Sequence, residues 1–232
     1  MTPISALAAM LLLAGASQPQ GPVQLRAVPL DVHDFKVLGE KYDPENPRPP
    51  DPTYYQTVDD LQQSFIRGVY FPPQATVTLV HEVPDEMRHG VRRMQWRWRA
   101  LVLPRKGDEC AIGRGDSAAA VYVTWKRGLR WYSLKFIWSN EAPLGATCNR
   151  MRNPLVVSDS IVLRTGMTSS AWVEETIDPE ALFRQHFANG DPAAEVPELQ
   201  GIGVMSDGDQ TRSISAADYA GFILLKEQGR AR

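Results

Sequence analysis

Hydrophobic and polar residues alternate with a period of two along several stretches of the chain. The clearest stretch, residues 93–103, puts one set of residues on a single side: Met94, Trp96, Trp98, Ala100 and Val102. The polar residues Gln95, Arg97 and Arg99 fall on the other side. Residues 130–139 repeat the pattern, with Tyr132, Leu134, Phe136 and Trp138 opposite Trp131, Ser133 and Lys135. This alternation predicts strands that each bury one face.

Shorter apolar runs between turn residues predict further strands. They cover residues 65–70, 75–82, 118–125, 160–164, 171–177, 201–205 and 217–225. The first two are expected to pair across Phe71-Pro72-Pro73. Residues 126–129 are expected to form a hairpin turn. The strands at 160–164 and 171–177 are expected to pair around Gly166.

One helix interrupts the strands. Asp178 suits its N-cap and Pro179 its first turn, while Asn189-Gly190 would end it. Many short strands, one short helix and no alternation of strand and helix predict an all-β fold. We expect an antiparallel two-sheet β-sandwich, jelly-roll-like, over residues 61–226.

The N-terminal region has a different composition. Residues 1–16 form a short apolar run that ends in Ala14-Gly15-Ala16 and are interpreted as a signal peptide. An uncut membrane tether is the alternative. Residues 17–60 are expected to form an N-terminal arm with a proline-rich segment, and residues 30–38 a short helix or an edge strand. The export signal predicts a periplasmic or secreted protein, not an integral membrane protein once the signal is cleaved.

Charge and cysteine content limit the classes of ligand and the cellular compartment that we expect. The formal net charge of -2 argues against nucleic-acid binding, which relies on a large excess of basic residues. Cys110 and Cys148 are the two cysteines, and in an oxidising compartment an even count favours a disulfide over two separate thiols.

Motifs for catalysis are missing from the sequence. It contains no nucleophile elbow, no zinc-protease motif, no phosphate loop and no dinucleotide fingerprint. Glu174 and Glu175 are neighbours, so on a strand they point to opposite faces and make a poor acid/base pair. We therefore expect a non-catalytic protein without a cofactor, although enzymatic activity stays open.

The segment Met205 to Thr211 holds Asp207 and Asp209 on either side of Gly208. Alternate carboxylates on a tight loop suit a hard cation such as calcium, so Asp207 and Asp209 are candidate metal ligands. The alternative is a polar turn in which aspartate caps backbone amides.

Six tryptophans offer candidate binding surfaces. Trp96, Trp98 and Trp138 lie on the apolar sides of their strands and are expected in the core. Trp131 and Trp172 share faces with charged or polar residues, so they are candidate exposed platforms for stacking on a sugar ring.

Several segments, in the order in which they follow one another along the chain, resemble a bacterial family known as domain of unknown function 3047. They are residues 96–99, 115–123, 134–138, 172–175, 201–211 and 217–222, and the resemblance runs from about Phe65 to Leu225. Two loops depart from the family pattern, namely residues 140–153 and 187–190. The resemblance implies an exported protein with a fold like the jelly-roll sandwiches of carbohydrate-binding modules.

These observations lead to one favoured function and two alternatives. We expect an exported, non-catalytic β-sandwich that binds a saccharide or cell-envelope polymer. The predicted ligand-binding residues are Trp131, Trp172, Glu174, Asp207 and Asp209. The first alternative is an envelope polysaccharide hydrolase or lyase, with Asp116, Glu174, Asp207 and Asp209 as candidate acids. The second is a structural or assembly partner protein of the envelope.

Overall fold

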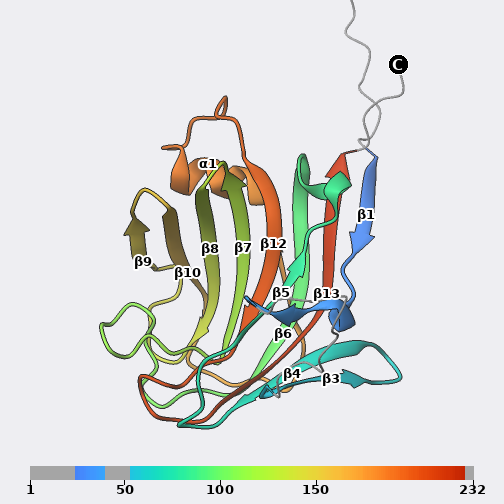
Figure 1. Cartoon of the computed structure of the whole chain (residues 1–232). Coiled ribbons are helices and arrows are strands. Elements are labelled where there is room, and N and C mark those ends of the chain that lie inside the picture. Colours follow the sequence, from blue (N-terminus) through green and yellow to red (C-terminus); the bar gives the residue numbers. More distant parts are fainter. Residues whose placement is uncertain (1–23, 40–52, 228–232) are drawn as a thin grey trace, which may run out of the picture.

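The computed structural model describes residues 24–39 and 53–227, which form two β-sheets facing each other (Figure 1). Sheet A has the strand order β11-β6-β13-β4-β3, and β1 also pairs with β13. Sheet B has the order β2-β5-β12-β7-β8-β10-β9. The predicted two-sheet β-sandwich with one short helix is therefore confirmed.

The strands of sheet A are β1 (Leu25–Pro29), β3 (Tyr55–Asp59), β4 (Ser64–Tyr70), β6 (Val91–Val102), β11 (Val173–Ile177) and β13 (Ser215–Glu227). The strands of sheet B are β2 (Lys36–Val37), β5 (Thr78–Glu82), β7 (Ala119–Arg127), β8 (Arg130–Ser139), β9 (Thr147–Arg152), β10 (Val156–Thr165) and β12 (Glu198–Met205). The helices are η1 (Val32–Asp34), η2 (Asp85–Met87) and α1 (Pro179–Phe187).

Two predicted strand pairs are wrong. β4 and β5 belong to different sheets, and so do β10 and β11. The connection after each first strand carries the chain across the sandwich instead of turning it back. A period-two pattern identifies a strand and its buried face but not its partner, so sequence alone could not distinguish these two routes.

The sheets are antiparallel with one parallel pair among the described residues, β8 with β10. The chain leaves β8, runs through the edge strand β9, and returns in β10 between the two. β10 is antiparallel to β9 and therefore runs in the same direction as β8. The antiparallel sandwich that we predicted therefore includes this one parallel pair.

Part of the predicted N-terminal arm lies in the sheets. Residues 24–39 contain β1, η1 and β2, so the segment at 30–38 holds both a short helix and an edge strand. Residues 53–60 contain β3. The predicted signal peptide and most of the proline-rich segment lie outside the described residues.

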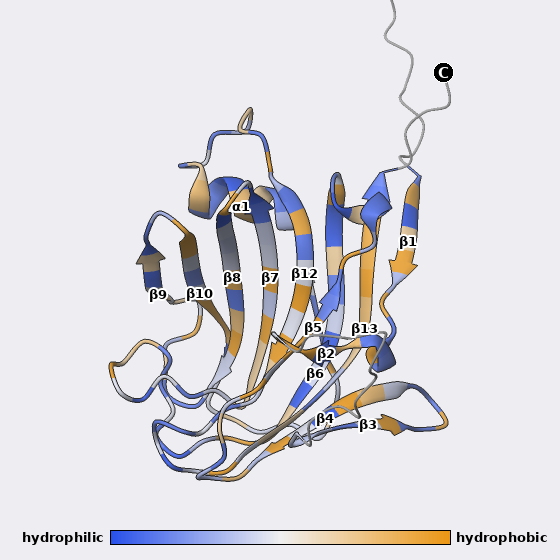
Figure 2. Ribbon diagram, in the orientation of Figure 1, coloured by the Kyte–Doolittle hydropathy of each residue, from blue (hydrophilic) through white to orange (hydrophobic). Residues whose placement is uncertain are grey.

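Aromatic side chains fill the space between the sheets. Trp96 and Trp98 of β6 are fully buried, and Phe136 and Trp138 of β8 meet them from the other sheet. The ring centroids lie 5.6 Å apart for Trp96 and Phe136 and 5.8 Å apart for Trp98 and Trp138. Hydrophilic and hydrophobic segments follow one another along the strands of both sheets (Figure 2), and on β6 the buried positions Met94, Trp96, Trp98 and Ala100 alternate with more exposed ones.

Helix α1 covers one end of the core (Figure 1). The Asp178 side chain accepts a hydrogen bond from the Ala181 amide at 2.9 Å, as expected of the predicted N-cap. Phe183 is buried against Trp125 and Tyr132, with ring centroids 5.5 Å and 5.1 Å away. Among the described residues, no helix is long and apolar enough to cross a membrane.

The predicted disulfide between Cys110 and Cys148 is present. It joins the long connection between β6 and β7 to the edge strand β9. Among the described residues β9 is the last strand of sheet B, so this bond fastens an edge strand to a loop.

Replacing Phe183 with alanine tests the role of the helix. Because the ring is 2% exposed, the variant should lose about 3–5 kcal/mol of unfolding free energy. Urea denaturation followed by tryptophan fluorescence measures this loss. Phe71→Ala removes the same ring at a half-exposed position and should change stability by less than about 1 kcal/mol. Equal losses in both variants would contradict the proposed packing.

Removing the disulfide tests its contribution to stability. A bond that closes 38 residues is expected to stabilise the fold by about 4 kcal/mol under the chain-entropy description. The double variant Cys110→Ser/Cys148→Ser should show this loss in urea denaturation, and the reduced wild type should match it. A variant as stable as the oxidised wild type would show that the bond adds nothing.

Candidate functional site

The outer face of sheet B carries a groove of about 600 Å³. Strands β5, β12, β7 and β8 supply most of its lining, and Leu38 and Arg88 complete the edge. Trp131 and Ser133 of β8 alternate with the core residues Tyr132 and Leu134, so they point away from the core. The groove therefore crosses several strands on the side of the sheet opposite the aromatic core.

Two glycines form part of its floor. Gly201 and Gly203 stand two residues apart on β12, and both lie on the groove side of the strand. A Cβ atom at Gly201 would lie 3.1 Å from a methyl group of Val80, and one at Gly203 would lie 3.2 Å from the Leu79 carbonyl oxygen. Side chains here would crowd the neighbouring strand and fill the hollow.

Trp131 lies at one end of the groove and is 40% exposed. The Lys126 ammonium lies 4.9 Å from the centroid of the Trp131 ring, within cation–π distance. This contact helps to hold the ring at the edge of the groove. An exposed, positioned aromatic ring can stack on another flat apolar surface, such as the face of a pyranose.

Polar groups also line the groove. The hydroxyls of Ser133 and Thr78 have no hydrogen-bond partner among the described residues. Thr124 donates to the Gly201 carbonyl oxygen at 3.0 Å. At the rim stand Glu82 and Arg88; Arg88 pairs with Asp85 at 2.9 Å, while its Nε atom is buried without a partner. The lining thus combines an aromatic ring with free donors and acceptors.

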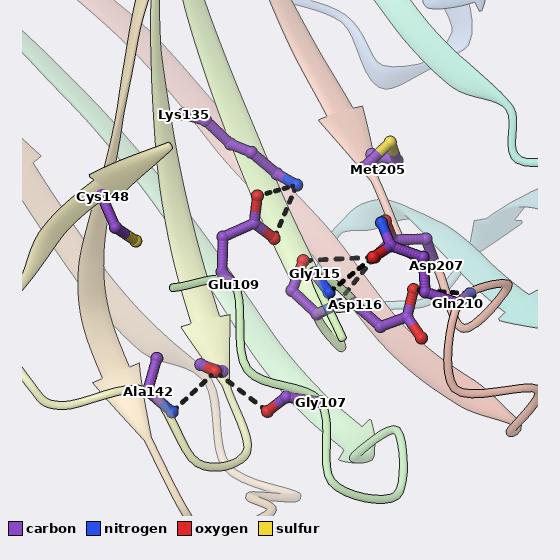
Figure 3. A network of polar contacts seen from close by, with 12 residues as sticks. Gly107, Glu109, Gly115, Asp116, Lys135, Ala142, Cys148, Met205, Asp207 and Gln210 are labelled. Atoms are coloured by element: carbon purple, nitrogen blue, oxygen red, sulfur yellow. Dashed lines mark hydrogen bonds and ion pairs between the residues drawn. The ribbon is translucent and has the colours of Figure 1, made fainter. Parts of the chain in front are cut away.

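A buried ion pair lies behind one wall of the groove. The Lys135 ammonium of β8 lies 3.0 Å from each carboxylate oxygen of Glu109, and both side chains are almost fully buried (Figure 3). The ammonium also lies 5.7 Å from the ring centroid of Tyr122, which lines the groove. Glu109 precedes Cys110, so the disulfide holds this carboxylate over Lys135.

Burial and neighbouring charges shift the pKa values of this group. Burial alone lowers the pKa of Lys135, but Tyr122, Asp207 and Glu109 raise it more, so the net shift is upward. Burial raises the pKa of Tyr122 to about 12. Burial also raises the pKa of Asp207 to about 7, although Lys135 and the Ser117 amide act in the opposite direction.

Asp116 and Asp207 clamp two loops together next to the ion pair (Figure 3). Asp207 accepts a hydrogen bond from the Ser117 amide at 2.8 Å. Asp116 accepts from the amides of Gln210 and Thr211 at 3.2 and 2.6 Å. These reciprocal contacts fix the connection before β7 against the turn after β12.

The predicted cation ligands lie in this clamp. Carboxylate oxygens of Asp116, Asp207 and Asp209 lie within 4.8 Å of one another. Asp116 and Asp207 already accept backbone amides, which is what the polar-turn alternative expects. Calcium takes six to eight oxygen ligands, so three carboxylates would have to be joined by further oxygens. Calcium binding by Asp207 and Asp209 stays a prediction.

The other two predicted site residues lie on the opposite sheet. Trp172 precedes β11, and the Arg99 guanidinium lies 4.4 Å from the centroid of its ring. Glu174 is exposed on β11, where the register places it beside Arg97. The five predicted ligand-binding residues are therefore divided among the groove, the loop clamp and the outer face of sheet A.

Several groove residues were not among the predicted site residues. Tyr122, Thr124, Gly201 and Gly203 line the groove but were not proposed. Two glycines at alternate positions of a strand are the signal that could have identified an empty face. The pairing of Glu109 with Lys135 has no such signal, because it joins a loop and a strand 26 residues apart.

The pKa of Asp207 predicts a pH dependence of stability. A carboxyl group whose pKa is raised from 3.8 to about 7 binds its proton more tightly in the folded state. Unfolding free energy should therefore fall as pH rises from about 4 to about 7, by at most about 1.4 kcal/mol per pH unit from this group.

The variant Asp207→Asn isolates this contribution. Its side-chain oxygen can still accept from the Ser117 amide, but it does not titrate. Urea denaturation from pH 4 to pH 8 should show the variant gaining stability relative to the wild type as pH rises. A difference between the two proteins that is the same at every pH would contradict the raised pKa.

Comparison with solved structures finds remote likenesses. The family 11 carbohydrate-binding module from Clostridium thermocellum, in complex with a β-1,3-1,4-mixed-linked tetrasaccharide, is 9% identical with a TM-score of 0.37, covering 92% of this chain and 95% of that chain. The xyloglucanase domain of NopAA from Sinorhizobium fredii, in complex with cellobiose, is 8% identical with a TM-score of 0.42, covering 78% and 91%. At such low identity and TM-score, neither the ligand nor the role of any residue in those proteins can be assigned to this chain.

Comparison with curated proteins finds no match. A family profile does match, over residues 49–223, and its description is protein of unknown function DUF3047. The match spans β3 to most of β13, and so includes most of the groove and the loop clamp. The chain belongs to the DUF3047 family.

Proposed function

We propose that this protein is an exported, non-catalytic β-sandwich that binds a saccharide or cell-envelope polymer in the groove of sheet B. One observation carries the proposal: Trp131 stands exposed at the end of a groove whose floor is kept open by Gly201 and Gly203. A sugar ring has apolar faces and a hydroxyl rim, so it needs an aromatic ring beside hydrogen-bonding groups.

The open shape of the groove and the polar groups in its lining support a sugar chain as the ligand. The free hydroxyl of Ser133 stands two residues from Trp131 on the same face of β8, and that of Thr78 lies farther along the groove, on β5; both can bond sugar hydroxyls. The groove crosses the strands instead of closing into a cavity, which suits an extended polymer. The disulfide supports a periplasmic or secreted location, because such bonds persist in oxidising compartments.

Binding is favoured over hydrolysis by the positions of the carboxylates. Of the described residues that line the groove, Glu82 is the one carboxylate, whereas glycoside hydrolysis uses two across the scissile bond. Asp116 and Asp207 are buried and accept backbone amides, and Glu174 lies on the other sheet. None of the proposed acids faces the groove.

Trp131→Ala tests the proposal directly. The protein is incubated with insoluble polysaccharides and peptidoglycan, and affinity for whichever polymer retains it is then measured. Loss of the stacking ring should weaken binding by about 1.5–3 kcal/mol, which is roughly 10- to 100-fold.

Phe71→Ala is the matched control, because it removes a half-exposed aromatic ring that does not line the groove. It should bind as the wild type does. Equal binding by all three proteins would place the site elsewhere. If the wild type binds no polymer, the saccharide proposal is wrong and the envelope-partner alternative gains weight.

A further inference from the structure

The outer face of sheet A holds a group of arginines that the groove does not involve. Asp218 of β13 is fully buried there between Arg67 of β4 and Arg99 of β6. Arg67 donates to both Asp218 oxygens at 2.8 Å, and Arg99 donates from Nε at 2.7 Å. One carboxylate therefore neutralises only one of two guanidinium groups.

Aromatic rings hold the Arg99 guanidinium in place. It lies 4.4 Å from the centroid of Trp172 and 5.4 Å from that of Phe65. The two rings meet edge to face, with centroids 5.6 Å apart. The cation is thus fixed by stacking as well as by Asp218, and Trp172 brings an aromatic surface next to it.

Arg97 lies next to this group and has no hydrogen bond or ion pair with any described residue. Its place depends on Gly221, which has a φ of +62° within a bulge of β13. A Cβ atom at Gly221 would lie 2.9 Å from Arg97 Nε, so the guanidinium rests where only a glycine leaves room. The N–H donors of the Arg97 guanidinium are therefore unused by the described residues, and the group lies close to the backbone of β13.

The charges of this face sum to a positive value. Alternation and register place Arg67, Arg93, Arg97 and Arg99 on the outer face, with three carboxylates, Asp218, Glu174 and Glu227. Arg93 also lacks a polar partner among the described residues. Glu174 stands beside Arg97 in the register, but the two do not form an ion pair. The protein as a whole has a net charge of -2, so this basic face is local.

We propose that the arginines around Asp218 bind the oxyanion groups of an acidic polysaccharide, with Arg97 as the primary contact. A guanidinium presents paired donors that match the two oxygens of a carboxylate or sulfate. Trp172 offers an aromatic surface for the adjoining sugar ring. This site is separate from the groove of sheet B and does not depend on the function proposed for it.

The size of the patch favours a sparsely charged sugar chain over nucleic acid. Nucleic-acid binding rests on neutralising many closely spaced phosphates. Two unpaired arginines on a protein of net negative charge provide one or two such contacts. A polysaccharide with about one charge per sugar ring fits this number.

Affinity electrophoresis in gels containing polymer tests the site. The probes are polygalacturonate, which carries carboxylates, and dextran sulfate, with neutral dextran as the uncharged control. The protein should be retarded by at least one acidic polymer and not by dextran. Retardation should weaken as salt rises from 0.05 to 0.5 M, because exposed charges are screened within about 10 Å at 0.1 M.

Arg97→Ala should weaken binding to that polymer about tenfold, the value of one charge-assisted hydrogen-bond pair. Since Arg97 has no polar partner, its thermal unfolding should match that of the wild type. Arg150→Ala, on the edge of sheet B, removes the same charge and should change binding less than twofold.

Two further results would overturn the proposal. One is equal binding by Arg97→Ala and Arg150→Ala, because net charge alone would then explain retention. The other is the absence of retardation by either acidic polymer. Trp131→Ala should keep its affinity for the acidic polymer, and a loss equal to that of Arg97→Ala would place the anion site in the groove instead.

Discussion

The contact between β6 of sheet A and β8 of sheet B holds the sandwich together. Trp96 and Trp98 meet Phe136 and Trp138 across the interface, and each of these rings is nearly or fully buried. Burying a large aromatic side chain contributes about 1.5–3 kcal/mol, so these four rings supply a large part of the cohesion between the sheets. Because a strand presents alternate residues to opposite sides, fixing these rings inward also fixes their neighbours outward.

This constraint places the chemistry of both outer faces. On β8 it directs Trp131, Ser133 and Lys135 to the groove side of sheet B. On β6 it directs Arg97 and Arg99 to the outer side of sheet A. A shift of either strand by one residue would bury charges and expose tryptophans, so the core sets the position of each candidate ligand contact.

The sequence predicted what depends on local pattern. The faces of residues 93–103 and 130–139, the helix with its Asp178 cap and the disulfide all followed from spacing and residue type. Strand partners did not, because Phe71 to Val77 can either turn the chain back or carry it to the other sheet. The division of Trp131 and Trp172 between two sheets depends on a second choice of this kind, at the connection between β10 and β11.

The two outer faces differ in how their buried charges are balanced. On sheet B, Lys135 meets Glu109 one to one, and the nearby Asp207 has its pKa raised to about 7 by burial. On sheet A, Asp218 is shared by Arg67 and Arg99, which leaves positive charge at the surface. A balanced pair needs no ligand, since its partners satisfy each other within the fold. Because Arg67 and Arg99 share the Asp218 carboxylate, some N–H donors of these partly exposed guanidinium groups stay available. Arg97 lies beside them, and no described residue accepts a hydrogen bond from its guanidinium. The balanced Lys135–Glu109 pair therefore suits a structural role behind the groove of sheet B. The excess positive charge on the outer face of sheet A suits binding of an anion from outside the chain.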